Sequence, residues 1–318
     1  MKMGETSKAR WSRLSRRWLV VIGLVGASVI IGVLSHSRHV RSDPNDVLRD
    51  AIVQGVQGNI AKLSSAAVVW RSESISFGPW AEKPRRVGDH QLWWDGRRTA
   101  VSCTTCSTTQ DPNGYVSSDR RARFITYDGT EFRVAELPTT AAGRAEVTIL
   151  KRPRYRPCEN YLVDIGWHGL GLMSNIGAAP TEPGTSRYLV EGPLIKMTFE
   201  NGRTGQIGVW TYDTEKAYGL IDYENYLQEG KIQSRTTIAY GQVSGGIWFP
   251  VRVVTETYSA QTGELLARSK MEVDMDKSVF NDPGALPEDV FELEAGPNTE
   301  VQDQTSLTTR LRMLMNDI

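Results

Sequence analysis

The sequence contains few of the side chains that most enzymes use for catalysis or for metal binding. Its 318 residues include three cysteines and four histidines. It lacks a G-x-S-x-G nucleophile elbow, a G-x-x-x-x-G-K-[ST] phosphate loop and an H-E-x-x-H zinc motif. His90 and His168 each stand alone in the sequence, and a lone histidine is more often structural than catalytic. We therefore expect no enzymatic activity, no catalytic residues, no metal and no cofactor.

An excess of charge of one sign is also absent. The 37 Lys and Arg residues balance the 37 Asp and Glu residues, so the formal net charge is 0. This balance conceals an asymmetry, because residues 1–41 carry a net charge of +7 and the remaining residues carry −7. A general nucleic-acid binder needs a basic surface, and no basic cluster follows residue 41. The composition thus excludes a general nucleic-acid partner.

One long apolar run is present, WLVVIGLVGASVIIGVLS at residues 18–35. It is just long enough to cross a bilayer as a helix. Six basic residues precede it, which by the positive-inside rule places the N-terminus in the cytoplasm. We predict a basic cytoplasmic segment at residues 1–17 and a transmembrane anchor, or uncleaved signal, at residues 18–35. The chain is then a single-pass protein of the cell (inner) membrane with its body outside the cytoplasm.

Two other interpretations of this run stay open. A cleaved signal peptide has the same order of basic, apolar and small residues, although Ser35-His36-Ser37 is a poor match to a cleavage site. The pair Arg16-Arg17 before the apolar run also fits a twin-arginine export signal.

The three cysteines leave at least one thiol outside any disulfide within the chain. Cys103 and Cys106 form a C-x-x-C whose Ser and Thr neighbours are typical of a strand or a loop, not of a helix start that activates a thiol. A zinc site needs four ligands, and the sequence has no second cysteine pair. A structural disulfide between two of Cys103, Cys106 and Cys158, free thiols, and a redox or metal role remain as three alternatives.

The pattern of the chain predicts one long helix followed by many strands. Asp43 and Pro44 are typical of a helix start, and apolar residues at three- and four-residue spacing predict a helix from about Pro44 to about Leu63. Residues 104–119 are expected to form an exposed loop, and residues 158–177 a short broken helix or lid. Strands are predicted at residues 66–73, 89–96, 121–129, 131–137, 146–150, 186–192, 194–200, 205–213, 217–223, 231–241, 247–259 and 265–276.

This order of elements, together with three short motifs, resembles the lipoprotein-carrier family of LolA- and LolB-like periplasmic proteins. The motifs are Tyr127-Asp128-Gly129-Thr130, Gly245-Gly246-Ile247-Trp248-Phe249-Pro250 and Leu286-Pro287-Glu288-Asp289-Val290-Phe291-Glu292-Leu293. The last motif is similar to the P-x-D-x-F ending of such proteins. The resemblance implies an α+β fold in which a strongly curved antiparallel sheet, an incomplete β-barrel, is covered by helices and encloses an apolar cavity for acyl chains.

On this basis residues 36–303 form an extracytoplasmic LolA-like β domain and residues 304–318 form a tail. The sequence departs from the family in its uncut anchor and in its C-x-x-C. A carrier that shuttles between membranes cannot be tethered to one of them. The departure therefore favours a membrane-fixed binder or sensor over a shuttle.

Tryptophan is plentiful in the body of the chain, and most of these residues lie in predicted strands. They either pack a core or line a cavity for an apolar ligand, since such cavities are mostly apolar with few polar groups. Trp93 and Trp94 are adjacent in one strand, so they must face opposite sides of the sheet. The candidate ligand-binding residues are Trp70, Trp93, Trp94, Phe124, Leu162, Trp167, Leu170, Trp210 and Trp248.

The function predicted from these features is that of a membrane-anchored extracytoplasmic protein that binds an apolar ligand. The expected partners are the acyl chain of a lipid or lipoprotein and, through residues 18–35, the cell membrane. The alternative is an envelope sensor or interaction module that contacts a membrane-protein partner and holds no ligand.

Overall fold

The computed structural model describes residues 43–110, 116–128, 131–137, 145–150, 184–227, 229–293 and 299–303. The predicted anchor at residues 18–35, the predicted helix or lid at residues 158–177 and the tail at residues 304–318 lie outside these ranges. Within them, no helix combines the length and the apolar composition needed to cross a membrane. By its internal contacts the chain divides into residues 1–47 and residues 48–318, and the larger unit contains the sheet.

The described secondary structure consists mainly of β-strands, with one α-helix, α2 (Pro44–Ile60), and four short 3-10 helices. The strands are β1 (Ala66–Ser76), β2 (Arg85–Trp94), β3 (Thr99–Gln110), β4 (Val116–Tyr127), β5 (Phe132–Leu137), β6 (Ala145–Leu150), β7 (Gly184–Glu191), β8 (Leu194–Asn201), β9 (Ile207–Asp213), β10 (Gly219–Tyr226), β11 (Ile232–Val243), β12 (Ile247–Tyr258), β13 (Leu265–Val273), β14 (Val279–Phe280) and β15 (Thr299–Asp303). The 3-10 helices are η1 (Gly78–Trp80), η3 (Thr214–Lys216), η4 (Pro283–Ala285) and η5 (Glu288–Phe291).

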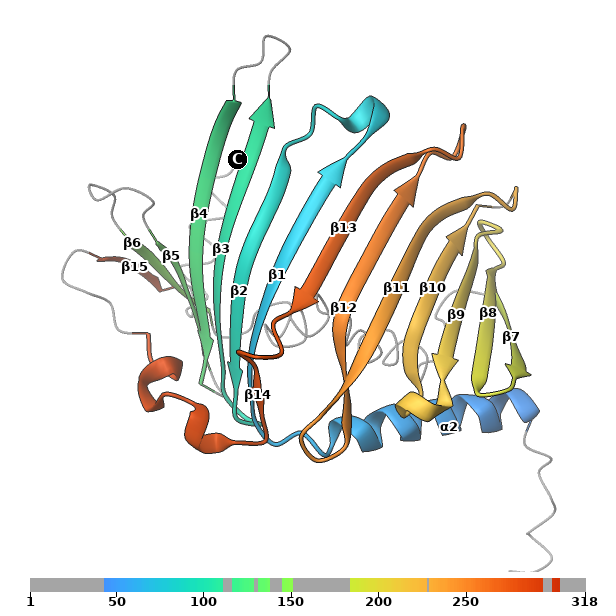
Figure 1. The fold of residues 1–318 in the computed structure, drawn as a ribbon, viewed down its shortest axis with the longest axis horizontal. Helices are drawn as coiled ribbons and strands as arrows, with labels where there is room; N and C mark the ends of the chain where they lie inside the picture. The colour runs from blue at the N-terminus through green and yellow to red at the C-terminus, as the bar shows by residue number, and fades with distance from the viewer. Residues whose placement is uncertain are drawn as a thin grey trace, which may run out of the picture. The chain divides into compact units, whose positions relative to one another are not determined.

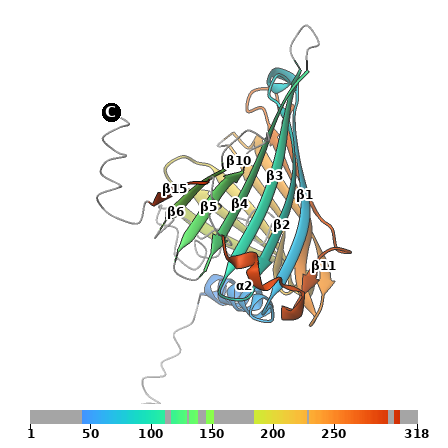
Figure 2. The same cartoon turned by 90° about the vertical axis from the view of Figure 1, so that its left-hand side faces the viewer.

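All strands belong to one open, curved sheet (Figures 1 and 2). Its order is β15-β6-β5-β4-β3-β2-β1-β13-β12-β11-β10-β9-β8-β7, with β14 paired to β1. Neighbours are antiparallel except for β15 and β6, which are parallel. The predicted curved antiparallel sheet is thus confirmed. The several covering helices of the prediction are not, because the described residues contain a single α-helix.

The start of α2 follows from local chemistry, as the sequence indicates. The Asp43 carboxylate accepts a hydrogen bond from the Asn45 backbone N–H at 2.9 Å, and Pro44 occupies the first helical position. The helix ends at Ile60, one turn earlier than predicted.

Helix α2 packs against one face of the sheet, which we call the concave face (Figure 2). Ile52 and Val56 lie one turn apart and are buried against the strands. The close approach requires Gly55, because a Cβ at this position would come within 2.1 Å of the Tyr218 ring. The first hydrophobic cluster contains Ile52, Val56, Ile195, Met197, Trp210, Tyr212, Leu220, Ile238 and Val253.

A second hydrophobic cluster surrounds β1 on the same face. Val68 lies opposite Leu92, which in turn lies opposite Val101, so the three side chains share one side of the sheet. Met271 packs against both clusters and joins them. The members of the second cluster are Leu63, Ala66, Val68, Trp70, Leu92, Val101, Ile247, Phe249, Val273 and Phe280.

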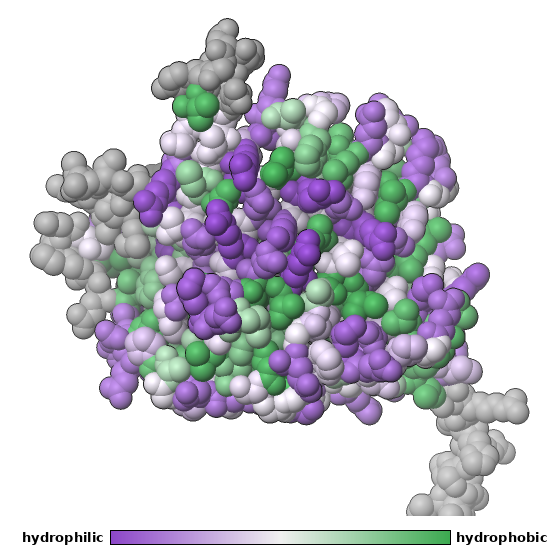
Figure 3. Space-filling model, in the orientation of Figure 1, coloured by the Kyte–Doolittle hydropathy of each residue, from purple (hydrophilic) through white to green (hydrophobic). Residues whose placement is uncertain are grey.

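The opposite, convex face carries charged side chains along its central strands. Ion pairs cross between neighbouring strands, as between Arg268 and Glu256 at 2.7 Å. Figure 3 shows a hydrophilic band across this face with hydrophobic side chains below it. Residues Asp282–Leu293, which we call the strap, cover part of this face beside β3 and bury Phe291.

The prediction of an exposed loop at residues 104–119 is wrong where the structure describes it. Residues 104–110 complete β3 and residues 116–119 begin β4, and the two strands pair from Thr99 and Tyr127 to Gln110 and Val116. The Ser and Thr residues of β3 that indicated a loop lie on both faces of the strand and are half-buried, and the β-branched threonine favours strands. Strands β14 and β15 were not predicted, because each is too short to show alternation.

Candidate functional site

Trp70 and His90 form a stacked aromatic pair on the concave face. They lie opposite each other on β1 and β2, with ring centroids 4.9 Å apart and an interplanar angle of 9°. The imidazole covers Gly88, where a Cβ would come within 2.4 Å of His90 Nε2. That nitrogen is 2.8 Å from Ser72 Oγ, and the buried Nδ1 has no hydrogen-bond partner. The pair therefore lacks the acidic group that orients the histidine in a catalytic triad.

Burial lowers the pKa of His90 to about 4, and the charge of Asp89 opposes this shift. Loss of hydration disfavours the charged imidazolium in this apolar setting. His90 is therefore neutral at pH 7, and its ring acts as part of the aromatic wall.

Because of His90, we expect the free energy of unfolding to decrease as the pH is lowered. Its folded pKa of about 4 lies below the ordinary value of 6.5, so the folded state binds fewer protons than the unfolded state. Well above pH 6.5 the ring is neutral in both states, and its titration does not affect stability. As the pH falls from 6.5 towards 4, the unfolded state takes up a proton that the folded state does not, and the free energy of unfolding decreases. Between pH 7.5 and pH 5 the free energy of unfolding should fall by about 1–2 kcal/mol more than in His90→Gln. Urea denaturation at both pH values measures this, and equal pH dependences would contradict it.

A second aromatic pair lies on the concave face near α2. Trp210 and Tyr223 are opposite each other on β9 and β10, with centroids 5.0 Å apart. The indole covers Gly208, where a Cβ would come within 2.3 Å of the ring. Trp210 Nε1 and the Tyr212 hydroxyl are buried without a hydrogen-bond partner, and burial raises the pKa of Tyr212. Such polar atoms in an apolar wall are ones that a water or a polar ligand atom would satisfy.

Small hydroxyl side chains line the concave face beyond the hydrophobic clusters. Ser74 lies opposite Ser269, which lies opposite Thr255, which lies opposite Thr236. The Oγ1 atoms of the two threonines are 3.0 Å apart, and all four residues are half-buried. The concave face is thus apolar where α2 covers it and polar towards the other strand ends.

The structure divides the predicted ligand-binding residues between the two faces. On the concave face lie Trp70, Trp94 and Trp210. On the convex face lie Trp93, Phe124 and Trp248, by alternation with their buried neighbours. Outside the described residues lie Leu162, Trp167 and Leu170. Trp93 and Trp94 do face opposite sides, as predicted, and the Trp93 ring lies beside Phe124 with centroids 6.3 Å apart.

Sequence reasoning missed several half-buried residues of the concave face. They are Tyr188, Phe199, Tyr223, Ile125 and Met271. Alternation divides the side chains of each strand between the two faces of the sheet. Only the pairing with neighbouring strands shows which side chains of different strands lie on the same face.

The C-x-x-C lies in β3, in agreement with its strand-like neighbours. Residues three apart in a strand point to opposite faces, so no disulfide joins Cys103 to Cys106. Cys158, the third residue of the disulfide prediction, lies outside the described residues.

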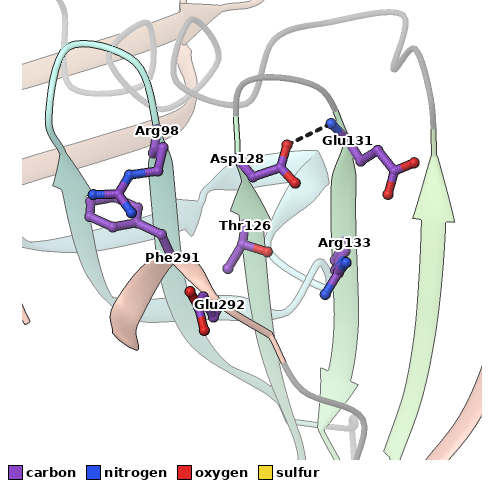
Figure 4. A pocket seen from close by; sticks show the side chains of 7 residues that line it. All are labelled: Arg98, Thr126, Asp128, Glu131, Arg133, Phe291 and Glu292. Carbon is purple, nitrogen blue, oxygen red and sulfur yellow. Dashed lines mark hydrogen bonds between the residues drawn. The ribbon is translucent and has the colours of Figure 1, made fainter. Parts of the chain in front are cut away.

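A polar pocket of about 290 Å³ lies on the convex face, between the strap and β3–β5 (Figure 4). The Arg98 guanidinium lies 4.4 Å from the centroid of the Phe291 ring and bonds to Asp95 Oδ2 at 2.7 Å. Arg133 donates a hydrogen bond to the Leu293 carbonyl at 3.2 Å. These contacts attach the strap to the sheet, so we interpret the pocket as part of this attachment. The sequence signal was the P-x-D-x-F motif, which supplies Phe291.

Comparison with known proteins gives similarity in fold only. No family model and no curated protein matches the chain. A LolA superfamily protein from Nitrosomonas europaea is 11% identical over 75% of this chain and 97% of its own, with a TM-score of 0.36. A DUF1329 family protein from Desulfovibrio piger is 9% identical over 79% and 98%, with a TM-score of 0.39.

The LolA superfamily is the family that the sequence motifs resemble. This resemblance implies a curved, open sheet covered by helices, and the described residues contain the sheet with one α-helix against its concave face. The chain thus has the curved, open sheet that the resemblance predicts. At these identities and TM-scores the matches carry no inference about a ligand or an activity.

Proposed function

We propose that the chain is a binding protein, without catalytic activity, whose concave face holds an acyl chain of a lipid or lipoprotein. The observation that carries the proposal is a wall of half-buried apolar side chains on both sides of the area that α2 covers. Trp94 and Ile125 lie on one side, and Tyr188, Phe199 and Tyr223 on the other. Among the described residues, the one α-helix, of 17 residues, covers only part of the sheet.

Simple energetics support an acyl chain as the ligand. Each buried methylene contributes about 0.8 kcal/mol. About ten buried methylenes therefore supply roughly 8 kcal/mol, which corresponds to a Kd near 1 μM. The hydroxyl groups at the far end of the concave face, such as Ser74 and Thr255, suit a polar head group.

The proposal places the body of the chain outside the cytoplasm, held to the inner membrane by residues 18–35. The apolar run and the basic residues before it support this placement. A fixed binder can accept or present an acyl chain at the membrane surface.

Native mass spectrometry of the full chain extracted in detergent tests the proposal. We expect a fraction of the protein to carry a lipid adduct, and a fluorescent fatty acid to bind the delipidated chain with a Kd of about 1 μM. A chain that carries no adduct and does not bind the fatty acid would refute the proposal. That result would favour the alternative function, an interaction module that contacts a membrane-protein partner and holds no ligand on its concave face.

The adjacent residues Trp94 and Trp93 provide a matched test of the face. Both are half-buried on β2, but Trp94 packs on the concave face and Trp93 on the convex face. Trp94→Ala should weaken fatty-acid binding about tenfold through lost apolar contact, and Trp93→Ala less than twofold. Titration of the fluorescent fatty acid measures both. Equal effects of the two variants would show that the ligand does not occupy the concave face.

A further inference from the structure

Strand β7 ends the sheet on one side, since it pairs with β8 and no described strand lies beyond it. An edge strand presents a row of backbone N–H and C=O groups to any strand that approaches. Natural proteins usually protect such an edge with proline, a bulge or an inward-pointing charge. Strand β7, which reads GTSRYLVE, contains no proline, and its two charged residues, Arg187 and Glu191, are of opposite sign, so they can pair with a second copy instead of repelling it.

In the second half of β7, apolar side chains lie between two charged ones, Arg187 and Glu191. Leu189 is 56% exposed and Val190 is 53% exposed, which makes them two of the most exposed large apolar residues of the described chain. They are adjacent, so they point to opposite faces of the sheet. Arg187 and Glu191 are exposed and lie symmetrically, two residues before and two residues after Leu189.

We propose that two copies of this chain associate through β7, antiparallel, about a two-fold axis that passes through Leu189. In this register Leu189 lies opposite Leu189 of the second copy. Arg187 of each copy lies opposite Glu191 of the other, and Tyr188 lies opposite Val190. The two sheets then continue into one another across the dimer.

Charge complementarity selects this register. A two-fold pairing centred on Arg187 or on Glu191 would place like charges opposite each other, which destabilises an antiparallel pair. A pairing centred on Tyr188 or on Val190 would place Leu189 opposite a charged residue. Only the pairing centred on Leu189 combines an apolar centre with two pairs of opposite charge.

Local geometry is compatible with the same register. Glu191 and Leu194 flank a two-residue turn at Gly192 and Pro193, where Gly192 has φ 62°, as a tight hairpin requires. In such a hairpin the closing residue Glu191 directs its backbone groups towards β8, and alternate residues do the same. Tyr188 and Val190 therefore direct their backbone groups outwards and face each other across the axis.

The contact of Glu191 within its own chain does not prevent the new pair. Lys196 Nζ is 2.7 Å from Glu191 Oε2, and this ion pair raises the pKa of Lys196. A carboxylate has two oxygens and accepts several donors, so Glu191 can bond to both Lys196 and Arg187 of the second copy. Each cross-strand pair contributes about 0.2–1 kcal/mol, so we expect a dimer that dissociates on dilution.

Disulfide trapping in the full chain tests the register. Leu189→Cys is introduced with Cys103, Cys106 and Cys158 replaced by serine, and Val190→Cys in the same background is the control. After mild oxidation in detergent, Leu189→Cys should give a covalent dimer on non-reducing gels, at least five times more than Val190→Cys. No dimer, or equal dimer from both variants, would overturn the proposal.

A charge-reversal series tests the same interface without added cysteines. Arg187→Glu should raise the dimer dissociation constant at least tenfold in sedimentation equilibrium. Adding Glu191→Arg to it should bring the constant back to within about threefold of the native value. Val116→Asp, at another apolar residue that is 56% exposed, is the matched control and should leave the dimer intact. A native chain that stays monomeric, or a double variant no better than Arg187→Glu, would overturn the proposal.

Discussion

Replacing Trp70 with alanine is expected to lower the free energy of unfolding by about 3–5 kcal/mol. Trp70 is 2% exposed within the second hydrophobic cluster. It stacks on His90 and lies opposite Val273 of β13. Strands β1 and β13 are distant in sequence, and Trp70 packs where they meet. Truncation removes this apolar surface and leaves a cavity. The cavity cannot close, because β1 is held by its pairing with β2 on one side and β13 on the other.

Trp80 is the matched control for this prediction. It lies in η1, is only half-buried, and its ring is covered by Lys83 Nζ at 3.4 Å from the centroid. Trp80→Ala should cost less than about 1 kcal/mol, since an exposed cation–π contact is worth about 0.5–1 kcal/mol. Chemical denaturation followed by far-UV circular dichroism measures both variants. A loss below 1 kcal/mol for Trp70→Ala would show that the cluster is not closely packed.

The elements that local chemistry determines are the ones that the sequence predicted. The start of α2 follows from Asp43 and Pro44, and β12 follows from its alternating residues. Turns with a glycine in the left-handed region, such as Gly263 with φ 75°, separate the expected strands. The first half of the β3–β4 hairpin was missed because Ser and Thr occur on both of its faces, so polarity does not alternate there.

The candidate site was less predictable because it depends on pairings between distant segments. Alternation shows that Trp93 and Trp94 differ in direction, but not which of them meets α2. That choice is made when β1 pairs with both β2 and β13, which joins the start of the domain to its end. The contact of His90 with Ser72 also requires the β1–β2 register, since the two residues are 18 positions apart.

Asn59 shows the same dependence on long-range contacts, and its replacement with alanine should cost about 2–3 kcal/mol. Its side chain is 5% exposed and bonds to both backbone groups of Trp248, 189 positions away. Nδ2 donates to the Trp248 carbonyl at 2.8 Å, and Oδ1 accepts from its N–H at 2.9 Å. The pairing of β13 with β12 begins only at Arg252, so Asn59 takes the place of a neighbouring strand at Trp248. Alanine would leave both groups without these partners, and each such loss costs about 1–3 kcal/mol when buried.

Asn59→Asp and Asn225→Ala separate this role from general packing. Aspartate keeps the acceptor but places a carboxylate oxygen against the Trp248 carbonyl, so Asn59→Asp should destabilise the chain at pH 7 at least as much as alanine. Asn225 makes a single side-chain bond, to Gln233 at 3.3 Å, and its replacement with alanine should cost less than about 1 kcal/mol. Urea denaturation compares the three variants. If Asn59→Ala cost no more than Asn225→Ala, the end of α2 would not be held to β12 by this side chain, and the attachment would rest on apolar contacts such as those of Ile52 and Val56.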